Sequence, residues 1–173
     1  ITERLRAIGH PVDVARRLGY LVAWKVIGPF DNTGEKGLDR PEPPEREIAL
    51  DAAYPGKHGE VRWKDYTSSD DLGQIDLNRA IGQEKDVLGY AAAEFYCDTE
   101  KNVEFRMSSD NAVKLWLNGQ LIGRYDIYHG GNVRDQYSGR ATLRAGRNVI
   151  LVKVCQNAQT QDWAAGWNFQ LRF

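Results

Sequence analysis

Residues 156–166 place one aromatic side chain among polar ones and show no strand periodicity. A sugar presents apolar C–H faces flanked by hydroxyl groups, so a sugar site needs an aromatic plane with amide, carboxylate or guanidinium groups around it. Trp163 offers the plane, and Asp162, Asn157 and Gln161 offer the polar groups. We therefore expect a ligand-binding loop here. The alternative is a polar loop whose tryptophan packs down as a lid.

A second segment, residues 124–137, has a similar mixture of groups around Gly130-Gly131, a pair that permits a tight turn. The alternative is again a polar loop whose rings pack on the body of the protein, and the sequence favours neither segment over the other. The candidate ligand-binding residues of this segment are Tyr125, Tyr128, His129 and Arg134.

Catalysis has weaker support from the sequence. His129 with Asp126 or Asp135 resembles a base and the residue that orients it, and Ser138 is a possible nucleophile. Their spacing matches no nucleophile elbow and no known order of a catalytic triad. The paired carboxylates of a glycosidase would have to face each other across a cleft, which a sequence does not reveal. We therefore predict no catalytic residue in this chain, although the longer protein could be an enzyme.

Metal binding and disulfide formation are two further possibilities. Asp31, Asn32 and Asp39 carry oxygen ligands that suit calcium, but their spacing matches no EF-hand loop. A structural calcium ion is thus possible, and no other cofactor is expected. Cys97 and Cys155 each end a strand-like run, so we expect two buried thiols, with a disulfide as the alternative if those ends are adjacent.

The tryptophans differ in their phase relative to apolar neighbours. Trp24, Trp63 and Trp167 are in phase with such neighbours and are predicted to lie in the core. Trp116 is out of phase with the apolar face of its own strand. Because the outer face of a sandwich strand normally meets water, Trp116 should either be covered by the long loop at residues 31–60 or stack on a ligand. We expect the cover, and keep Trp116 as a candidate ligand-binding residue.

Short β-prone runs separated by turn residues fill the second half of the chain. Asn118-Gly119 between two such runs predicts a hairpin with a type I′ turn, which needs positive φ at both central positions. Many short strands without intervening helices predict an all-β fold, a two-sheet antiparallel β-sandwich of jelly-roll form. The expected strands are residues 90–97, 103–107, 112–117, 120–125, 140–143, 149–154 and 167–173.

The first half of the chain is less regular. A strand begins at residue 21, and Gly28-Pro29 is expected to stop it. Residues 31–60 are rich in Gly, Pro and charge, and their prolines exclude them from a central strand. Residues 1–20 show loose helical spacing, so we expect a short helical leader or linker from an upstream domain, followed by one sandwich domain over residues 21–173.

Length and charge exclude several classes of function. The 173 residues suffice for one domain with a real core. The 23 basic and 24 acidic residues nearly cancel, which argues against nucleic acid or an anionic membrane as the main partner. No run of apolar residues is long enough to span a membrane, and the start resembles no signal peptide. Because the chain begins at Ile1 rather than Met, we expect a segment of a longer protein.

Several phrases of the sequence resemble the galactose-binding-like jelly-roll domains attached to glycoside hydrolases and to large bacterial extracellular proteins. The resemblance covers residues 90–173, and residues 24–32 resemble the first strand of the same module. It implies a sugar- or glycan-binding accessory module, often non-catalytic, sometimes with a calcium ion that holds loops together. The phrases that carry it are YAAAEFYCD, VEFRMSSDNAVKLWLNGQLIG, TLRAGRNVILVKVCQ and GWNFQLRF.

Three functions are consistent with these features. The first is a non-catalytic carbohydrate-binding module that targets a larger secreted or periplasmic protein to a polysaccharide or oligosaccharide. The second is a structural or protein-interaction sandwich that packs on a neighbouring domain, with Trp116 or Trp163 in the contact. The third, least favoured, is a hydrolase or lyase acting on a glycan. We expect the first.

Overall fold

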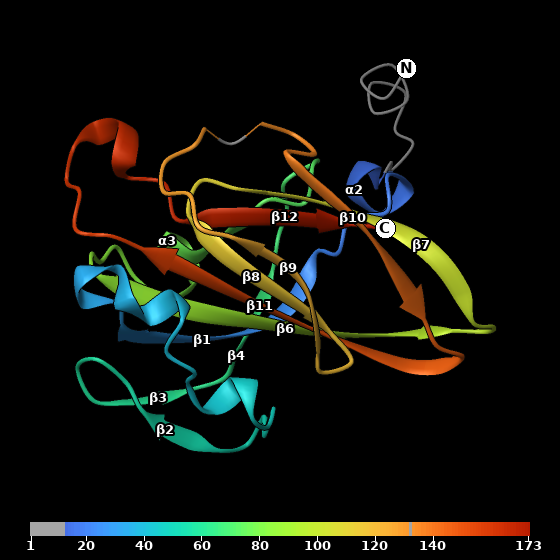
Figure 1. Ribbon diagram of the computed structural model, residues 1–173, viewed down its shortest axis with the longest axis horizontal. Helices are drawn as coiled ribbons and strands as arrows, with labels where there is room; N and C mark the ends of the chain where they lie inside the picture. The colour runs from blue at the N-terminus through green and yellow to red at the C-terminus, as the bar shows by residue number, and fades with distance from the viewer. Residues whose placement is uncertain (1–12, 132) are drawn as a thin grey trace.

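Twelve strands and five short helical turns make up the described part of the chain, residues 13–131 and 133–173 of the computed structural model (Figure 1). The helical turns are α2 (Val14–Arg17), η1 (Thr33–Leu38), η2 (Pro43–Glu45), α3 (Leu77–Ala80) and η3 (Asp162–Ala164). The strands are β1 (Ala23–Asp31), β2 (Ala53–Pro55), β3 (Glu60–Arg62), β4 (Lys64–Thr67), β5 (Ile75–Asp76), β6 (Val87–Cys97), β7 (Lys101–Ser109), β8 (Ala112–Leu117), β9 (Gln120–Tyr125), β10 (Tyr137–Leu143), β11 (Gly146–Gln156) and β12 (Asn168–Arg172).

The strands form two facing antiparallel sheets and a separate hairpin. The larger sheet has the order β4-β1-β6-β11-β8-β9, the smaller has the order β10-β7-β12-β5, and β2 pairs with β3. In Figure 1 the smaller sheet lies above the larger one, and the β2–β3 hairpin lies below it. The predicted all-β antiparallel sandwich is confirmed. Of the predicted leader, residues 1–12 lie outside the described residues, and α2 follows at Val14.

The main core lies between the two sheets, where each strand sends alternate side chains inward. Trp24 and Trp167 are buried there as predicted, and Trp24 makes an edge-to-face contact with Phe169 at 5.1 Å between ring centroids. The turn at Asn118-Gly119 joins β8 to β9, and both residues have positive φ, as a type I′ turn requires. The hairpin prediction is therefore confirmed.

A second core covers the outer face of the larger sheet. The covering segment, residues 32–63, crosses this face and buries apolar side chains against outward-facing residues of β1, β6 and β11. Trp63 is buried in this layer, which confirms the prediction that it is a core residue. Trp116 is half-buried and packs against the same layer, as does Ile48 of the covering segment. The expected cover is present, and the outward-facing residues that it contacts are buried.

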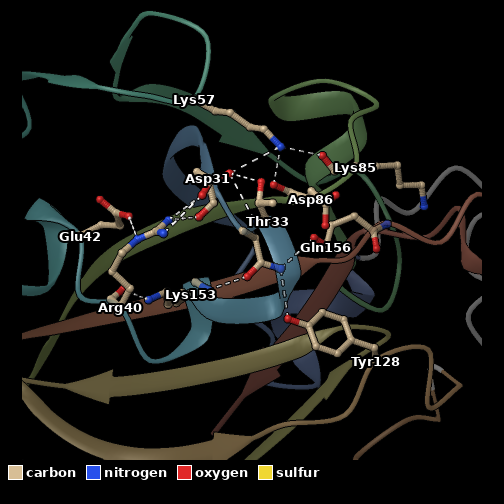
Figure 2. Close-up of polar contacts among 12 residues, drawn as sticks. Asp31, Thr33, Arg40, Glu42, Lys57, Lys85, Asp86, Tyr128, Lys153 and Gln156 are labelled. Atoms are coloured by element: carbon tan, nitrogen blue, oxygen red, sulfur yellow. Dashed lines mark hydrogen bonds and ion pairs between the residues drawn. The ribbon is translucent and has the colours of Figure 1, made fainter.

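One buried lysine ties the covering segment to the sheet. Lys153 of β11 is 0% exposed, and its Nζ donates to the carbonyl of Leu38 at 3.2 Å and to that of Arg40 at 2.7 Å. The same ammonium pairs with the carboxylate of Glu45 at 2.7 Å, and the Tyr90 hydroxyl donates to that carboxylate at 2.5 Å. Burial and the neighbouring Glu45 raise the pKa of Tyr90, so its hydroxyl stays a donor. Figure 2 shows Lys153 directed at the backbone of Arg40.

The end of β1 corrects a sequence-based expectation. β1 does not stop at Gly28-Pro29 but continues to Asp31. Its pairing with β6 shifts between Ile27 and Phe30, so the ladder requires no donor from the nitrogen of Pro29.

The two cysteines lie at opposite ends of the same strand pair. Cys97 is opposite Gly146 and Cys155 is opposite Leu88, a separation of nine strand positions or roughly 30 Å. Both thiols are free, and the disulfide alternative is excluded because its sulfur atoms could not meet. Cys155 is buried as expected, whereas Cys97 is only half-buried.

Candidate functional site

A network of buried side-chain amides organises one end of the sandwich. Gln156, the last residue of β11, accepts hydrogen bonds at Oε1 from Asn111 Nδ2 at 2.9 Å and from the backbone N–H of Asn157 at 3.1 Å. Its Nε2 donates to the carbonyl of Ala164 at 3.2 Å, and its own carbonyl accepts from Asn32 Nδ2 at 2.9 Å. Buried polar groups that satisfy one another in this way rigidify their surroundings. The network therefore fixes the ends of β1, β8 and β11 relative to η3.

The loop after β11 presents an exposed indole at this end. Trp163 lies in η3 and is 64% exposed, although the next residue, Ala164, is fully buried. The ring of His129 meets the indole edge-to-face, with 5.4 Å between centroids and an angle of 82°. The two candidate segments of the sequence thus come together at one place. Their juxtaposition leaves much of the indole open to solvent.

A short chain of hydrogen bonds runs from His129 to an acidic side chain. His129 Nε2 lies 2.8 Å from Asn157 Oδ1, and Asn157 Nδ2 donates to Glu35 at 2.9 Å and to Gln159 at 3.1 Å. Because the Asn157 nitrogen is the donor to both oxygens, its oxygen is the acceptor, and the network assigns the hydrogen of His129 to Nε2. His129 Nδ1 is buried without a hydrogen-bond partner among the described residues.

We call the group formed by Trp163, His129, Asn157 and Glu35 the end site. It combines an indole, an imidazole, an amide and a carboxylate, and these groups come from three loops that are distant in sequence. In Figure 1, η1, which carries Glu35, and η3, which carries Trp163, lie at the same end of the sandwich.

The remaining predicted residues have different surroundings. Tyr128 lies behind the end site, where its hydroxyl accepts from Asn32 Nδ2 at 3.1 Å (Figure 2), and burial raises its pKa. Tyr125 stacks on Tyr137 at 3.8 Å and closes the edge between β9 and β10. Asp162 is exposed and begins η3 next to Trp163, and Arg134 is exposed in the loop before β10.

The suggested catalytic partners of His129 are otherwise engaged. Asp135 pairs with Arg172 and with Arg106, the latter at 3.4 Å, and these cations lower the pKa of Asp135. Asp126 lies 3.3 Å from Arg124. The hydrogen bond that orients the imidazole is accepted by an amide oxygen, Asn157 Oδ1, rather than by a carboxylate.

The suggested calcium ligands do not converge. Figure 2 shows Asp31 directed at Arg40 and Lys57, and its carboxylate lies 3.8 Å from the Lys57 ammonium. Asp39 pairs with Lys114 and with Arg124, both at 2.9 Å. The third candidate, Asn32, is buried and directs its amide nitrogen inward as described above. Within residues 13–131 and 133–173, no group of three or more His, Cys, Asp or Glu side chains could hold a metal ion.

Sequence reasoning missed Glu35 of the end site and Gln159, which holds Asn157 in place. Glu35 lies about 90 residues before His129 and was hidden in a loop rich in glycine and charge. Glu35 has a positive φ of 62°, and the turn-rich sequence DNTGEKG is the one local signal of that conformation. Nothing in the sequence indicates that Glu35 contacts Asn157. Gln159 lay inside the predicted loop, and its role became visible only through its hydrogen bonds to Asn157.

Comparison with known proteins identifies the fold. No protein-family model and no curated protein matches the chain. Part of a β-glucosidase from Kluyveromyces marxianus superposes with a TM-score of 0.50 and 12% sequence identity, over 86% of this chain and 16% of that one. This likeness shows a shared sandwich fold, and the chain spans less than a fifth of that enzyme.

Weaker likenesses to other solved structures were also found. A β-glucuronidase from an uncultured Clostridium sp. superposes with a TM-score of 0.47 and 13% identity, over 88% of this chain and 28% of that one. A family 35 carbohydrate binding module from Clostridium thermocellum gives a TM-score of 0.31 and 13% identity, over 49% of this chain and 69% of that one.

Among the described residues, no helix has the length and apolar character needed to cross a bilayer.

Proposed function

We propose that this chain is a non-catalytic carbohydrate-binding module of the galactose-binding-like kind, which directs a larger extracellular or periplasmic protein to a polysaccharide or oligosaccharide. The observation that carries the proposal is the end site, where the open indole of Trp163 lies beside His129, Asn157 and Glu35. An aromatic plane with polar groups at its edge matches the alternating apolar and hydroxylated surface of a sugar ring.

The rigid support of the site favours binding. Because the loops are held by the buried network around Gln156, the side chains of the end site are ordered before a ligand arrives. Ordering loops and side chains on binding costs free energy, so a preorganised site binds more tightly. The likeness to part of a β-glucosidase agrees with an accessory sandwich attached to a carbohydrate-active protein, and it concerns the fold alone.

A non-catalytic role fits the use of the carboxylate. Glu35 accepts a hydrogen bond from the Asn157 amide, so it orients a recognition group. Glycosidases canonically place two carboxyl groups on either side of the bond to be cleaved, one as acid and one as nucleophile or base. In the end site one carboxylate, that of Glu35, contacts the side-chain amide of Asn157, and this arrangement suits a group that holds a ligand through polar contacts.

The experiment is a glycan array followed by affinity electrophoresis with the captured polysaccharide. Trp163→Ala should abolish retardation while leaving the midpoint of thermal unfolding nearly unchanged, since most of this indole is already exposed. Tyr96→Ala is the matched control: Tyr96 is 73% exposed and lies nine positions along β6 from the strand end near Gln156. Binding of a neutral glycan that survives Trp163→Ala, or an array with no captured neutral glycan, would refute the proposal.

A second function has one observation in its favour. Apolar side chains are exposed near the end site, with Val133 at 65% and Ile127 at 48% in the loop that carries His129. Exposed apolar patches mark protein contacts as well as ligand sites. A protein-interaction sandwich that packs this end on a neighbouring domain predicts that Val133→Asp disrupts the contact, as measured by co-purification with the adjoining part of the longer protein.

A further inference from the structure

A pocket on the face of the larger sheet combines an aromatic ring with several cations. This face pocket has a volume of about 310 Å³ and lies between the covering segment and the β10–β11 turn. Trp116 is half-buried in its wall beside Ile48. The charged residues that line the pocket are Glu45, Arg46, Glu47, Arg144 and Arg147.

The charges of the face pocket leave two guanidinium groups without a carboxylate partner. Glu45 is engaged by Lys153, and Arg147 pairs with Glu94. Arg144 donates from Nε to the carbonyl of Arg147 at 2.7 Å, and within residues 13–131 and 133–173 neither it nor Arg46 forms an ion pair. The terminal nitrogens of Arg144 therefore remain available to an acceptor from outside the chain.

Arginine is well suited to a planar anion. Its guanidinium holds a carboxylate through two parallel N–H donors, and such charge-assisted bonds are stronger than neutral ones. An indole nearby offers a surface for the C–H face of a ring. A ligand that satisfies both has a saturated ring with a carboxylate attached to it.

We propose that the face pocket binds a saccharide that carries a carboxylate, that is, a uronate residue. Trp116 contacts the sugar ring, and Arg46 and Arg144 receive its carboxylate. A neighbouring pocket of about 320 Å³ shares Ile48 and Val149 with this one, so an oligosaccharide fits the surface better than a single ring. The face pocket and the end site are formed by different residues, and this inference holds or fails independently of the proposed function.

The experiment is isothermal titration of the whole chain with tetragalacturonate and with its methyl-esterified form, which keeps the rings and removes the charge. The acidic form should bind at least tenfold more tightly. Arg46→Gln and Arg144→Gln should each weaken it about tenfold with an unchanged midpoint of thermal unfolding. Arg140→Gln is the matched control, because Arg140 is exposed on β10 and lines a different surface, so it should change nothing.

Two further variants sharpen the test. Glu47 lines the face pocket and forms no ion pair in the described part of the chain, so Glu47→Gln removes a repulsive charge and should tighten binding severalfold. Trp163→Ala should leave binding of the acidic ligand unchanged, which separates this pocket from the end site. The inference is overturned if the two ligand forms bind equally, if neither binds, or if Arg140→Gln weakens binding as much as Arg144→Gln.

Discussion

Replacement of Lys153 by methionine tests how the covering segment is held. Methionine has a similar volume, so the change removes the charge without leaving a large cavity. The carbonyls of Leu38 and Arg40 lose their donor, and the carboxylate of Glu45, whose side chain is 13% exposed, loses its cation. Removing one partner of a buried ion pair costs about 3–5 kcal/mol because the other charge is left uncompensated.

The double variant Glu45→Gln with Lys153→Met separates the charge from the packing. Glutamine keeps an acceptor for the Tyr90 hydroxyl but carries no charge. The double variant should therefore be more stable than Lys153→Met alone by about 2 kcal/mol, because it no longer leaves a buried charge without a partner. The free energy of unfolding is measured by urea denaturation followed through tryptophan fluorescence.

The expected loss is a large share of the roughly 5–15 kcal/mol that stabilises a typical domain. Hydrogen exchange should also accelerate selectively at the amides of residues 38–48, because the ammonium is the anchor of this stretch. A cost below about 1 kcal/mol for Lys153→Met, or no recovery in the double variant, would refute the ionic anchor.

Three further predictions concern a thiol, a carboxylate and a glycine. In the native state iodoacetamide at pH 8 should label Cys97 alone, because burial raises the pKa of Cys155 to about 12. Mass spectrometry should find both cysteines labelled after unfolding in urea. Labelling of Cys155 in the native state would contradict its burial. The hydrogen bonds from Lys114 and Arg124 lower the pKa of Asp39 to about 2, so its ion pairs stabilise the fold above pH 4, and this contribution is lost as the pH falls from about 4 through 2 to about 1. Asp39→Asn should therefore cost only a few tenths of a kcal/mol at pH 7, since the carboxylate is exposed, and nothing at about pH 1; a cost that persists there would exclude the ionic cause. Gly37→Ala should destabilise by about 1–3 kcal/mol in urea denaturation, because its Cβ would lie 2.5 Å from Leu88 and 2.6 Å from Asn32, and a neutral result would show that η1 can shift.

The sandwich was predictable because its signals are local. Alternation of side chains placed Trp24 and Trp167 in the core, and Asn118-Gly119 specified a hairpin turn without help from the rest of the chain. The continuation of β1 past Pro29 was not predictable in this way, because it depends on where the register of its pairing with β6 shifts.

The candidate site was predictable in its parts and not in its assembly. Trp163, His129 and Asn157 were each identified by residue type in an irregular segment, and the sequence could not show that the two segments meet. Glu35 joins them from a third loop, and this contact depends on the register of the whole sheet. The phase of Trp116 correctly marked an unusual outer face, yet the buried Lys153 on that face carried no warning, since lysine in a strand normally meets water.

The most direct test of carbohydrate binding follows the indole N–H groups by ¹H–¹⁵N NMR while a glycan captured on the array is titrated into the labelled chain. The five tryptophans give five such signals, and Trp163→Phe assigns the one in the end site. We predict that the Trp163 signal shifts in a saturable manner together with the backbone amide of His129, while the signals of the buried Trp24 and Trp167 stay in place. A neutral glycan that binds without moving the Trp163 signal would contradict the end site as the place of recognition.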